Sequence, residues 1–278
     1  TTDNDANDIT LRTTAGDIQV YTINAKAAGD VSLTSEAGAI IDASADDATA
    51  NVTADTATLT AKTGIGSTAL LGDFNVDLTT GVAAENTGKF GDAGIRYDIV
   101  ITQATAAGDM TLAAVQKNPE GTGAVLVSVP GGTLIVASTG VAVAGSGNTL
   151  LTASAGITLN APVTSGGNIS LLAGAGITQE AAGDITASGA GKTIDVKAGG
   201  AIAMADGAVT GSANGNIRYE ATTGDIAIGE LNAGTAKVAV IATAVSMFEE
   251  PPQYNICSAR RVPKERRQGQ IVARCAGP

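Results

Sequence analysis

Histidine and tryptophan are absent from this sequence, and aromatic residues make up only 3% of its 278 residues. Without imidazole the chain cannot form a Ser-His-Asp triad, a Cys-His nucleophile pair or a histidine-containing zinc or iron site. These absences exclude most hydrolase mechanisms, so we expect no enzyme, no cofactor and no metal centre. The shortage of aromatic side chains also argues against an ordinary globular core, which uses more of them.

Long apolar runs are missing too. None approaches the roughly 18 residues that a helix needs to cross a bilayer, and Thr1 opens into polar sequence without an export signal. No polar cap precedes the first apolar strand pattern at Ile9, although a bare solenoid end would expose strand edges. We therefore expect the C-terminal part of a longer exported protein, with any signal removed or upstream.

Basic residues are scarce outside the last thirty positions. Residues 249–278 hold six basic and three acidic side chains, a net charge of +3. Because the whole chain has a net charge of −11, residues 1–248 carry −14. An acidic body cannot release phosphate counterions in number, so we expect no nucleic-acid partner. Solubility is the simplest role of this charge.

What the sequence has instead is a repeat. Between Gly166 and Leu231 an apolar residue returns every seven to nine positions, usually behind a glycine turn, and most of these residues begin an apolar-x-apolar couple. The starts are Ile169, Ile177, Ile185, Ile194, Ile202, Val209, Ile217 and Ile226, and the couple at the last of them ends at Ile228. Such alternation is typical of short strands, and strands at constant spacing bury their apolar face only when successive coils stack. The repeat predicts a parallel β-solenoid.

The same rhythm extends over most of the chain. Similar couples run from Ile9 through Val82 and from Val125 through Ile241, and we expect residues 1–248 to form the solenoid. Counting one strand for every eight or nine residues predicts roughly thirty strands in about ten turns, a rod about 50 Å long. The 36 glycines and the aliphatic couples suit a narrow core in which similar side chains stack from coil to coil.

The rhythm falters between Val82 and Val125, where two polar loops are predicted. Loops that leave the coil on one side are where solenoids place their contacts, and insertions without a partner are the plain alternative. The candidate contact residues in these loops are Phe90, Arg96, Tyr97, Lys117 and Asn118.

Carboxylates carry the two remaining chemical hypotheses. A pair drawn from Asp42, Asp46, Asp47 and Asp55 would be needed to cleave a glycan, but this segment lacks the aromatic platform on which sugars stack. The Gly-Asp steps lack the calcium-binding Gly-Gly-x-Gly-x-Asp pattern, because an apolar residue follows the aspartate directly. We expect these aspartates to close turns through hydrogen bonds to their own backbone, with adventitious calcium as the alternative.

Repeated Gly-Asp-Ile-x-Val and Ala-Gly-x-Ile-x-Leu units with Ala, Thr and Ser between them resemble the filamentous haemagglutinin-type exoproteins of bacterial two-partner secretion. The resemblance covers residues 9 to about 245. It implies a right-handed parallel β-helix that is exported unfolded through an outer-membrane pore and folds on the cell surface. Autotransporter passenger domains are similar, but residues 249–278 are too short for the membrane barrel that they require.

The tail, residues 249–278, begins at Glu249-Glu250-Pro251-Pro252 and contains both cysteines of the chain, Cys257 and Cys275. An even pair in an otherwise cysteine-free, exported protein predicts one disulfide, whose loop would stabilise the chain by about 3 kcal/mol in the chain-entropy model. High-molecular-weight adhesins of the two-partner type resemble this in ending with a cysteine pair whose loop holds the protein in its secretion pore. An anchor, a solenoid cap and a flexible tail all stay open.

Two classes of function follow. The favoured one is a non-enzymatic adhesive filament shaft on the bacterial surface, anchored at the outer membrane through its secretion pore, with a host or neighbouring-cell ligand that the sequence does not name. The competing one is a β-helix enzyme that cleaves polysaccharide.

Overall fold

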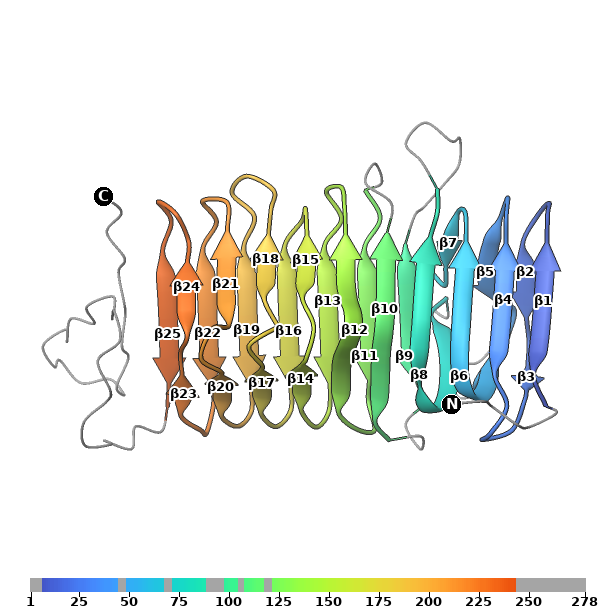
Figure 1. Ribbon diagram of the computed structural model, residues 1–278, viewed down its shortest axis with the longest axis horizontal. Coiled ribbons are helices and arrows are strands. Elements are labelled where there is room, and N and C mark those ends of the chain that lie inside the picture. The colour runs from blue at the N-terminus through green and yellow to red at the C-terminus, as the bar shows by residue number, and fades with distance from the viewer. Residues whose placement is uncertain are drawn as a thin grey trace, which may run out of the picture.

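The computed structural model describes residues 7–44, 49–67, 72–88, 98–104, 108–117 and 122–243. Within these ranges the protein is all-β and has no helix, and its parallel strands stack into a β-solenoid of about nine turns (Figure 1). The predicted fold class is confirmed. Cys257 and Cys275 lie outside the described residues, as does the rest of the tail.

Twenty-five strands make up this solenoid. The N-terminal ones are β1 (Ile9–Thr13), β2 (Ile18–Val20), β3 (Ile23–Asn24), β4 (Val31–Ser35), β5 (Ala39–Asp42), β6 (Val52–Ala61), β7 (Gly64–Ile65), β8 (Phe74–Asn86), β9 (Ile99–Gln103), β10 (Met110–Lys117), β11 (Val125–Val129) and β12 (Leu134–Val143). The C-terminal ones are β13 (Thr149–Ala153), β14 (Ile157–Leu159), β15 (Val163–Ser165), β16 (Ile169–Ala173), β17 (Ile177–Gln179), β18 (Ile185–Ala187), β19 (Ile194–Ala198), β20 (Ile202–Met204), β21 (Val209–Ser212), β22 (Ile217–Ala221), β23 (Ile226–Ala227), β24 (Glu230–Asn232) and β25 (Val238–Ala242).

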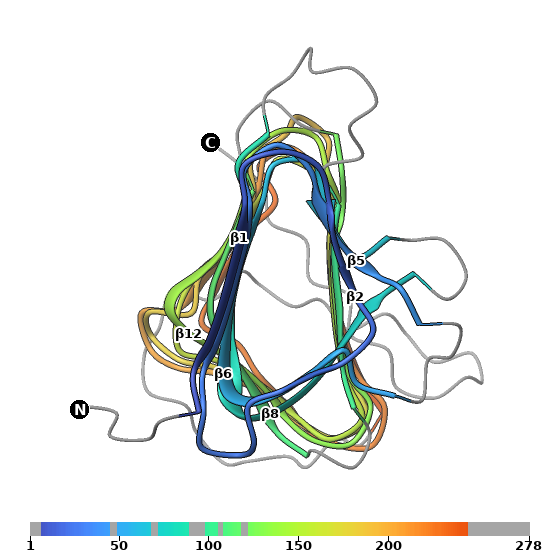
Figure 2. The same cartoon turned by 90° about the vertical axis from the view of Figure 1, so that its right-hand side faces the viewer.

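Seen from its N-terminal end the solenoid is a three-sided tube (Figure 2). The chain climbs along β1, crosses to β2 and returns along the base, so it runs clockwise while it recedes from the viewer (Figure 2). Clockwise motion away from the viewer describes a right-handed helix, the hand that the resemblance implied. We call the wall formed by the ladder β2–β5–β7–β9–β11–β13–β16–β19–β22–β25 wall A.

The C-terminal coils repeat one simple plan. In these coils wall A consists of β13–β16–β19–β22–β25, and two shorter ladders, β14–β17–β20–β23 and β15–β18–β21–β24, form the other sides. The repeat predicts that successive starts fall on successive sides of the coil; those at 169, 177 and 185 do, and Ile194 pairs with Ile169 one coil later. The repeat also predicts that Ile169, Leu171, Ile185, Ile194 and Val196 lie inside, and all five are buried.

Glycine allows the coils to stack tightly at their corners. A Cβ atom built on Gly166 would overlap the carbonyl oxygen of Gly145, and one on Gly199 would overlap that of Gly174. A side chain at these positions would therefore push neighbouring coils apart. This requirement explains why glycine recurs between the aliphatic couples.

The N-terminal coils use longer strands that turn a corner without a break. One end of β12 pairs with β14 and the other with β15, so two sides of the tube are joined in a single strand. Ser138 and Gly140 make the bend inside β12, with φ values of 55° and 77°. Continuous strands of this kind lower the count to twenty-five in the described residues, against the predicted thirty.

Two apolar residues of the repeat do not occupy inward positions. In β21 the inward position belongs to Thr210, which pairs with Ile185, whereas Val209 is only half-buried. Ile228 lies beyond the end of β23 and is 39% exposed. In both places the apolar residue identified the strand but not its inward face.

Candidate functional site

The two predicted contact loops leave the solenoid at neighbouring points. Lys117, the last residue of β10, pairs with Asn86, the last residue of β8. The loop that follows β8 and the loop that follows β10 therefore begin side by side on adjacent coils. Phe90, Arg96, Tyr97 and Asn118 lie outside the described residues.

The carboxylates proposed for glycan cleavage are engaged in local hydrogen bonds. Asp42 Oδ1 accepts from the backbone N–H of Ser44 and from Asn51 Nδ2, both at 2.6 Å. Asp55 Oδ1 accepts from the hydroxyls of Thr79 and Thr80, and these bonds hold the pKa of Asp55 below its ordinary value. A general acid needs the opposite shift. Asp46 and Asp47 lie outside the described residues.

Asp17, Asp109 and Asp184, which stand in Gly-Asp steps, bond to the backbone of the next coil rather than to their own turn, so our expectation was wrong for these three. Asp17 Oδ1 accepts the backbone N–H of Ala39 at 2.8 Å, and Asp109 Oδ1 accepts that of Thr133 at 2.7 Å. Asp184 does the same for Val209 at 2.8 Å. These carboxylates connect consecutive coils, and we call such a hydrogen bond between a side chain and the backbone of the next coil a stitch. The described residues contain no group of three or more Asp, Glu, Cys or His side chains placed to hold a metal ion.

Asparagine performs this task in the C-terminal coils. Asn168 Oδ1 accepts the backbone N–H of Thr193 at 2.9 Å and its hydroxyl at 3.2 Å, and Asn216 Oδ1 accepts the N–H of Lys237 at 3.1 Å. Asn148, Asn168 and Asn216, which precede the wall A strands β13, β16 and β22, therefore tie their coils to the ones that follow.

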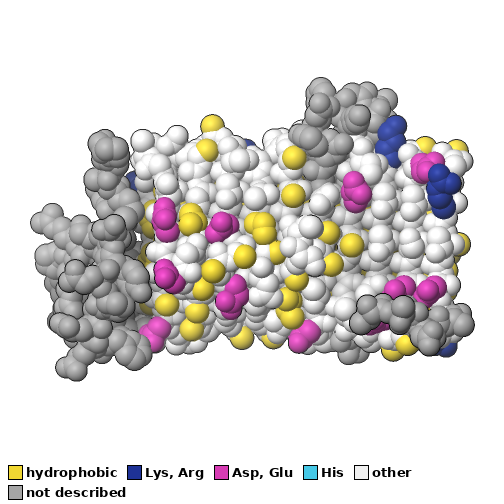
Figure 3. Space-filling view, in the orientation of Figure 1, with side chains coloured by type: hydrophobic (Ala, Val, Ile, Leu, Met, Phe, Trp, Pro, Cys, Tyr) yellow, Lys and Arg dark blue, Asp and Glu magenta, His cyan; other side chains and the backbone are white. Residues whose placement is uncertain are grey.

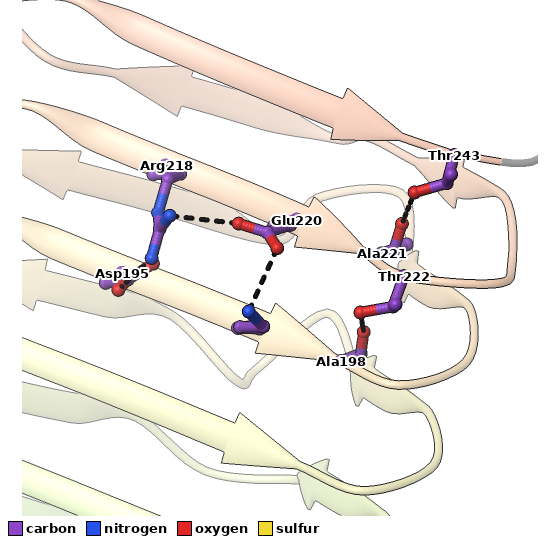
Figure 4. Close-up of polar contacts among 8 residues, drawn as sticks. Asp195, Ala198, Arg218, Glu220, Ala221, Thr222 and Thr243 are labelled. Atoms are coloured by element: carbon purple, nitrogen blue, oxygen red, sulfur yellow. Dashed lines mark hydrogen bonds and ion pairs between the residues drawn. The ribbon is translucent and has the colours of Figure 1, made fainter. Parts of the chain in front are cut away.

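A strip of four charged side chains lies on the outer surface of wall A at its C-terminal end (Figure 4). Arg218 donates from Nε to Asp195 Oδ1 at 2.8 Å, from Nη2 to Asp195 Oδ2 at 2.6 Å and from Nη1 to Glu220 Oε2 at 2.9 Å. Lys197 Nζ lies 3.0 Å from Glu220 Oε1. The hydrogen bonds to Asp195 raise the pKa of Arg218. The strip balances its own charges across two coils.

Beside this strip runs a shallow groove of about 620 Å³. It crosses wall A where β11, β13, β16 and β19 end, and its lining includes Ser128, Thr152, Ser154, Leu172, Lys197 and Thr222. The hydroxyls of Thr152 and Thr222 donate to backbone carbonyls of the preceding coil. Among the described residues that line the groove none is acidic or aromatic. It therefore offers a contact surface of hydroxyls, aliphatic side chains and one lysine, without a carboxylate pair.

The face opposite wall A carries mostly uncharged side chains, and its charged side chains are mainly acidic (Figure 3). Asp and Glu side chains are spread along its length, whereas the Lys and Arg side chains in view lie chiefly near the N-terminal end (Figure 3). Hydrophobic side chains on this face are scattered rather than gathered into one patch.

Sequence reasoning missed the buried polar side chains of Gln179, Thr210 and Tyr219. Only the apolar-x-apolar spacing of Ile217 and Tyr219 gave a signal, and it marked the tyrosine as inward-facing. No family model, curated protein or solved structure matches this chain. The described part of the chain has no helix that could span a membrane.

Proposed function

We propose that this chain is the shaft of a secreted or surface-attached bacterial filament, with a structural and adhesive role and no catalytic one. The observation that carries the proposal is the use of its polar residues. Asp17, Asp109, Asp184, Asn168 and Asn216 all bond to the backbone of the following coil. Side chains that an enzyme would direct into a cleft instead hold an extended rod together.

Surface labelling tests the shaft. Antibodies raised against the solenoid should label intact cells of the bacterium that encodes the chain, and brief protease treatment of those cells should remove the label. A strain that lacks the protein should adhere less to host or neighbouring cells. Label found only after lysis would overturn the proposal.

The competing function, cleavage of polysaccharide, has a direct test. A β-helix enzyme should lower the viscosity of its substrate, whereas a shaft should leave a panel of acidic and neutral polysaccharides unchanged. In an active preparation, replacing Asp55 with Asn should abolish the activity if the carboxylates of this segment carry it.

The tail extends the proposal to an anchor. Cys257 and Cys275 flank a basic segment that follows a Pro-Pro step, and a closed loop is bulkier than the extended chain that threads a pore. We expect a Cys257→Ser, Cys275→Ser double variant to fold normally but to be shed into the medium. If it stays on the cells, or if the native thiols react with maleimide before reduction, the anchor fails while the shaft is unaffected.

A further inference from the structure

Three polar side chains meet inside the core of the C-terminal coils. Gln179, Thr210 and Tyr219 are each 1% exposed or less. They come from β17, β21 and β22, which lie on three different sides of the tube and belong to three consecutive coils. They meet because all three side chains point into the lumen of the tube.

These side chains satisfy one another. Tyr219 Oη lies 2.7 Å from Thr210 Oγ1 and donates to Gln179 Oε1 at 2.9 Å. Gln179 Nε2 donates to the Val209 carbonyl and to Thr210 Oγ1, both at 3.2 Å. A buried polar group without a partner is costly, so this network depends on the relative position of all three coils.

The aliphatic ladders around the network do not specify that position. Wall A stacks Ile169 on Ile194 and Ile194 on Ile217, and the next side stacks Ile177 on Ile202 and Ile202 on Ile226. A coil that slipped by one full turn would again place isoleucine on isoleucine. Apolar burial alone therefore distinguishes poorly between the native stacking and a stacking that skips a coil.

We propose that the Gln179–Thr210–Tyr219 network is a register key, which makes the native order of coils the one stacking in which these three buried polar side chains are paired with one another. A skipped coil would bring Gln179 opposite aliphatic side chains and leave Tyr219 and Thr210 without their partners. The buried asparagine Asn51 near the N-terminal end bonds mainly to backbone groups instead. It bonds to the Val20 carbonyl and to Asp42, and accepts the N–H of Asn75.

Thiol cross-linking during refolding tests the key in the full chain, with Cys257 and Cys275 replaced by Ser. A cysteine pair at Thr178 and Ala203, outward-facing partners in β17 and β20, reports the native stacking. A pair at Thr178 and Ala227 reports a skipped coil, because Ala227 is the partner of Ala203 one coil further on. A short bifunctional thiol reagent joins a pair only when its strands are adjacent.

The decisive variant removes the key without leaving unpaired groups, by Gln179→Leu, Thr210→Val and Tyr219→Phe together. We expect its yield of the 178–227 cross-link to rise at least tenfold over the parent, while Ile194→Val, an apolar change in the same ladders, leaves the yield at the parent level. An equal yield in the triple variant and the parent would overturn the proposal.

Single variants keep the test decisive if the triple variant does not fold. Thr210→Ser retains the hydroxyl and should keep the 178–227 yield low, whereas Thr210→Val should raise it. If the two variants give the same yield, the hydroxyl does not set the register and the proposal fails.

Discussion

The two ends of the solenoid stack their coils with different strand lengths, different corners and different hydrogen-bonding side chains. From β13 onward the coils use strands of two to five residues, corners that mostly contain glycine and mostly asparagine stitches. Before β13 the strands reach 13 residues, corners form inside strands, and the stitches are mostly aspartates. Three of the four buried side-chain atoms without a partner among the described residues, in Asp42, Asn75 and Asn86, belong to this N-terminal part.

The difference shows what makes a repeat regular. Coils whose corners mostly contain glycine can stay similar, and hydrogen bonds between stacked coils then join residues 20 to 25 positions apart. The predicted contact loops follow β8 and β10, two of the long strands of the N-terminal part. We therefore expect contact loops in the N-terminal part and an uninterrupted rod in the C-terminal part.

The largest effect is expected from a charge in the regular core. Ile194 is 1% exposed and stacks between Ile169 and Ile217. The substitution Ile194→Asp should lower the free energy of unfolding by several kcal/mol, about 4, because an unpaired carboxylate would enter a dry core. Urea titration measures the loss.

Two control variants bracket this result. Ile194→Val should cost about 1 kcal/mol, and Thr178→Asp, on the outer surface of β17, should cost little. If Ile194→Asp is as stable as Thr178→Asp, the inward face of β19 has been assigned wrongly.

A smaller effect is expected at a corner. Gly166→Ala should destabilise the C-terminal coils by about 2 kcal/mol, because the new methyl group overlaps the Gly145 carbonyl oxygen. At Gly211 the nearest atom to a built Cβ is 4.0 Å away and φ is not positive, so Gly211→Ala should change stability by less than about 1 kcal/mol. Equal thermal midpoints for the two variants would contradict the corner argument.

The sequence predicted what depends on neighbours along the chain and missed what depends on neighbours across coils. Couples such as Ile169-Ser170-Leu171 located the strands because alternation is a local property. The stitch from Asp17 to Ala39 could not be foreseen, since its acceptor and donor come together only after the coils stack. For the same reason Thr210 was passed over in favour of Val209, whose apolar side chain fits the pattern but lies only partly inside.

The candidate site was predictable to a lesser degree. The pairing of Lys117 with Asn86 agrees with two loops that begin on the same side of the solenoid. The turn residues between Val82 and Val125 had indicated these loops. The charged strip on wall A was missed, because Asp195 and Arg218 lie 23 positions apart and only their register brings them together.

Alkaline pH should act on the C-terminal part through Tyr219. Burial raises the pKa of the Tyr219 phenol in the folded state above its ordinary value near 10. Stability is then fully present below about pH 10 and is lost above it, by about 1.4 kcal/mol for each pH unit, because the unfolded chain releases the proton first.

Replacing this tyrosine separates its contribution from general alkaline damage. Tyr219→Phe should reduce the fall of the urea midpoint with rising pH between pH 9.5 and about 11. Tyr21→Phe, at a side chain that is 70% exposed, should leave that pH dependence unchanged. The same slope in Tyr219→Phe and the parent would show that Tyr219 does not govern the alkaline loss.

The smallest effect is expected from acid on the N-terminal part. Hydrogen bonds from Thr79 and Thr80 lower the pKa of Asp55 in the folded state. Its contribution is therefore present above the unfolded pKa of about 3.9 and is lost as pH falls through the lower folded value. Asp55 is only partly buried, so solvent screening should keep the loss below about 1 kcal/mol. In the Thr79→Val, Thr80→Val double variant the carboxylate loses both donors, and its share of the acid slope between pH 4 and 2 should disappear, as it should in Asp55→Asn. Carboxyl titration followed by NMR provides the direct measurement: a pKa for Asp55 that stays the same in parent and double variant would show that the threonine hydroxyls do not lower it.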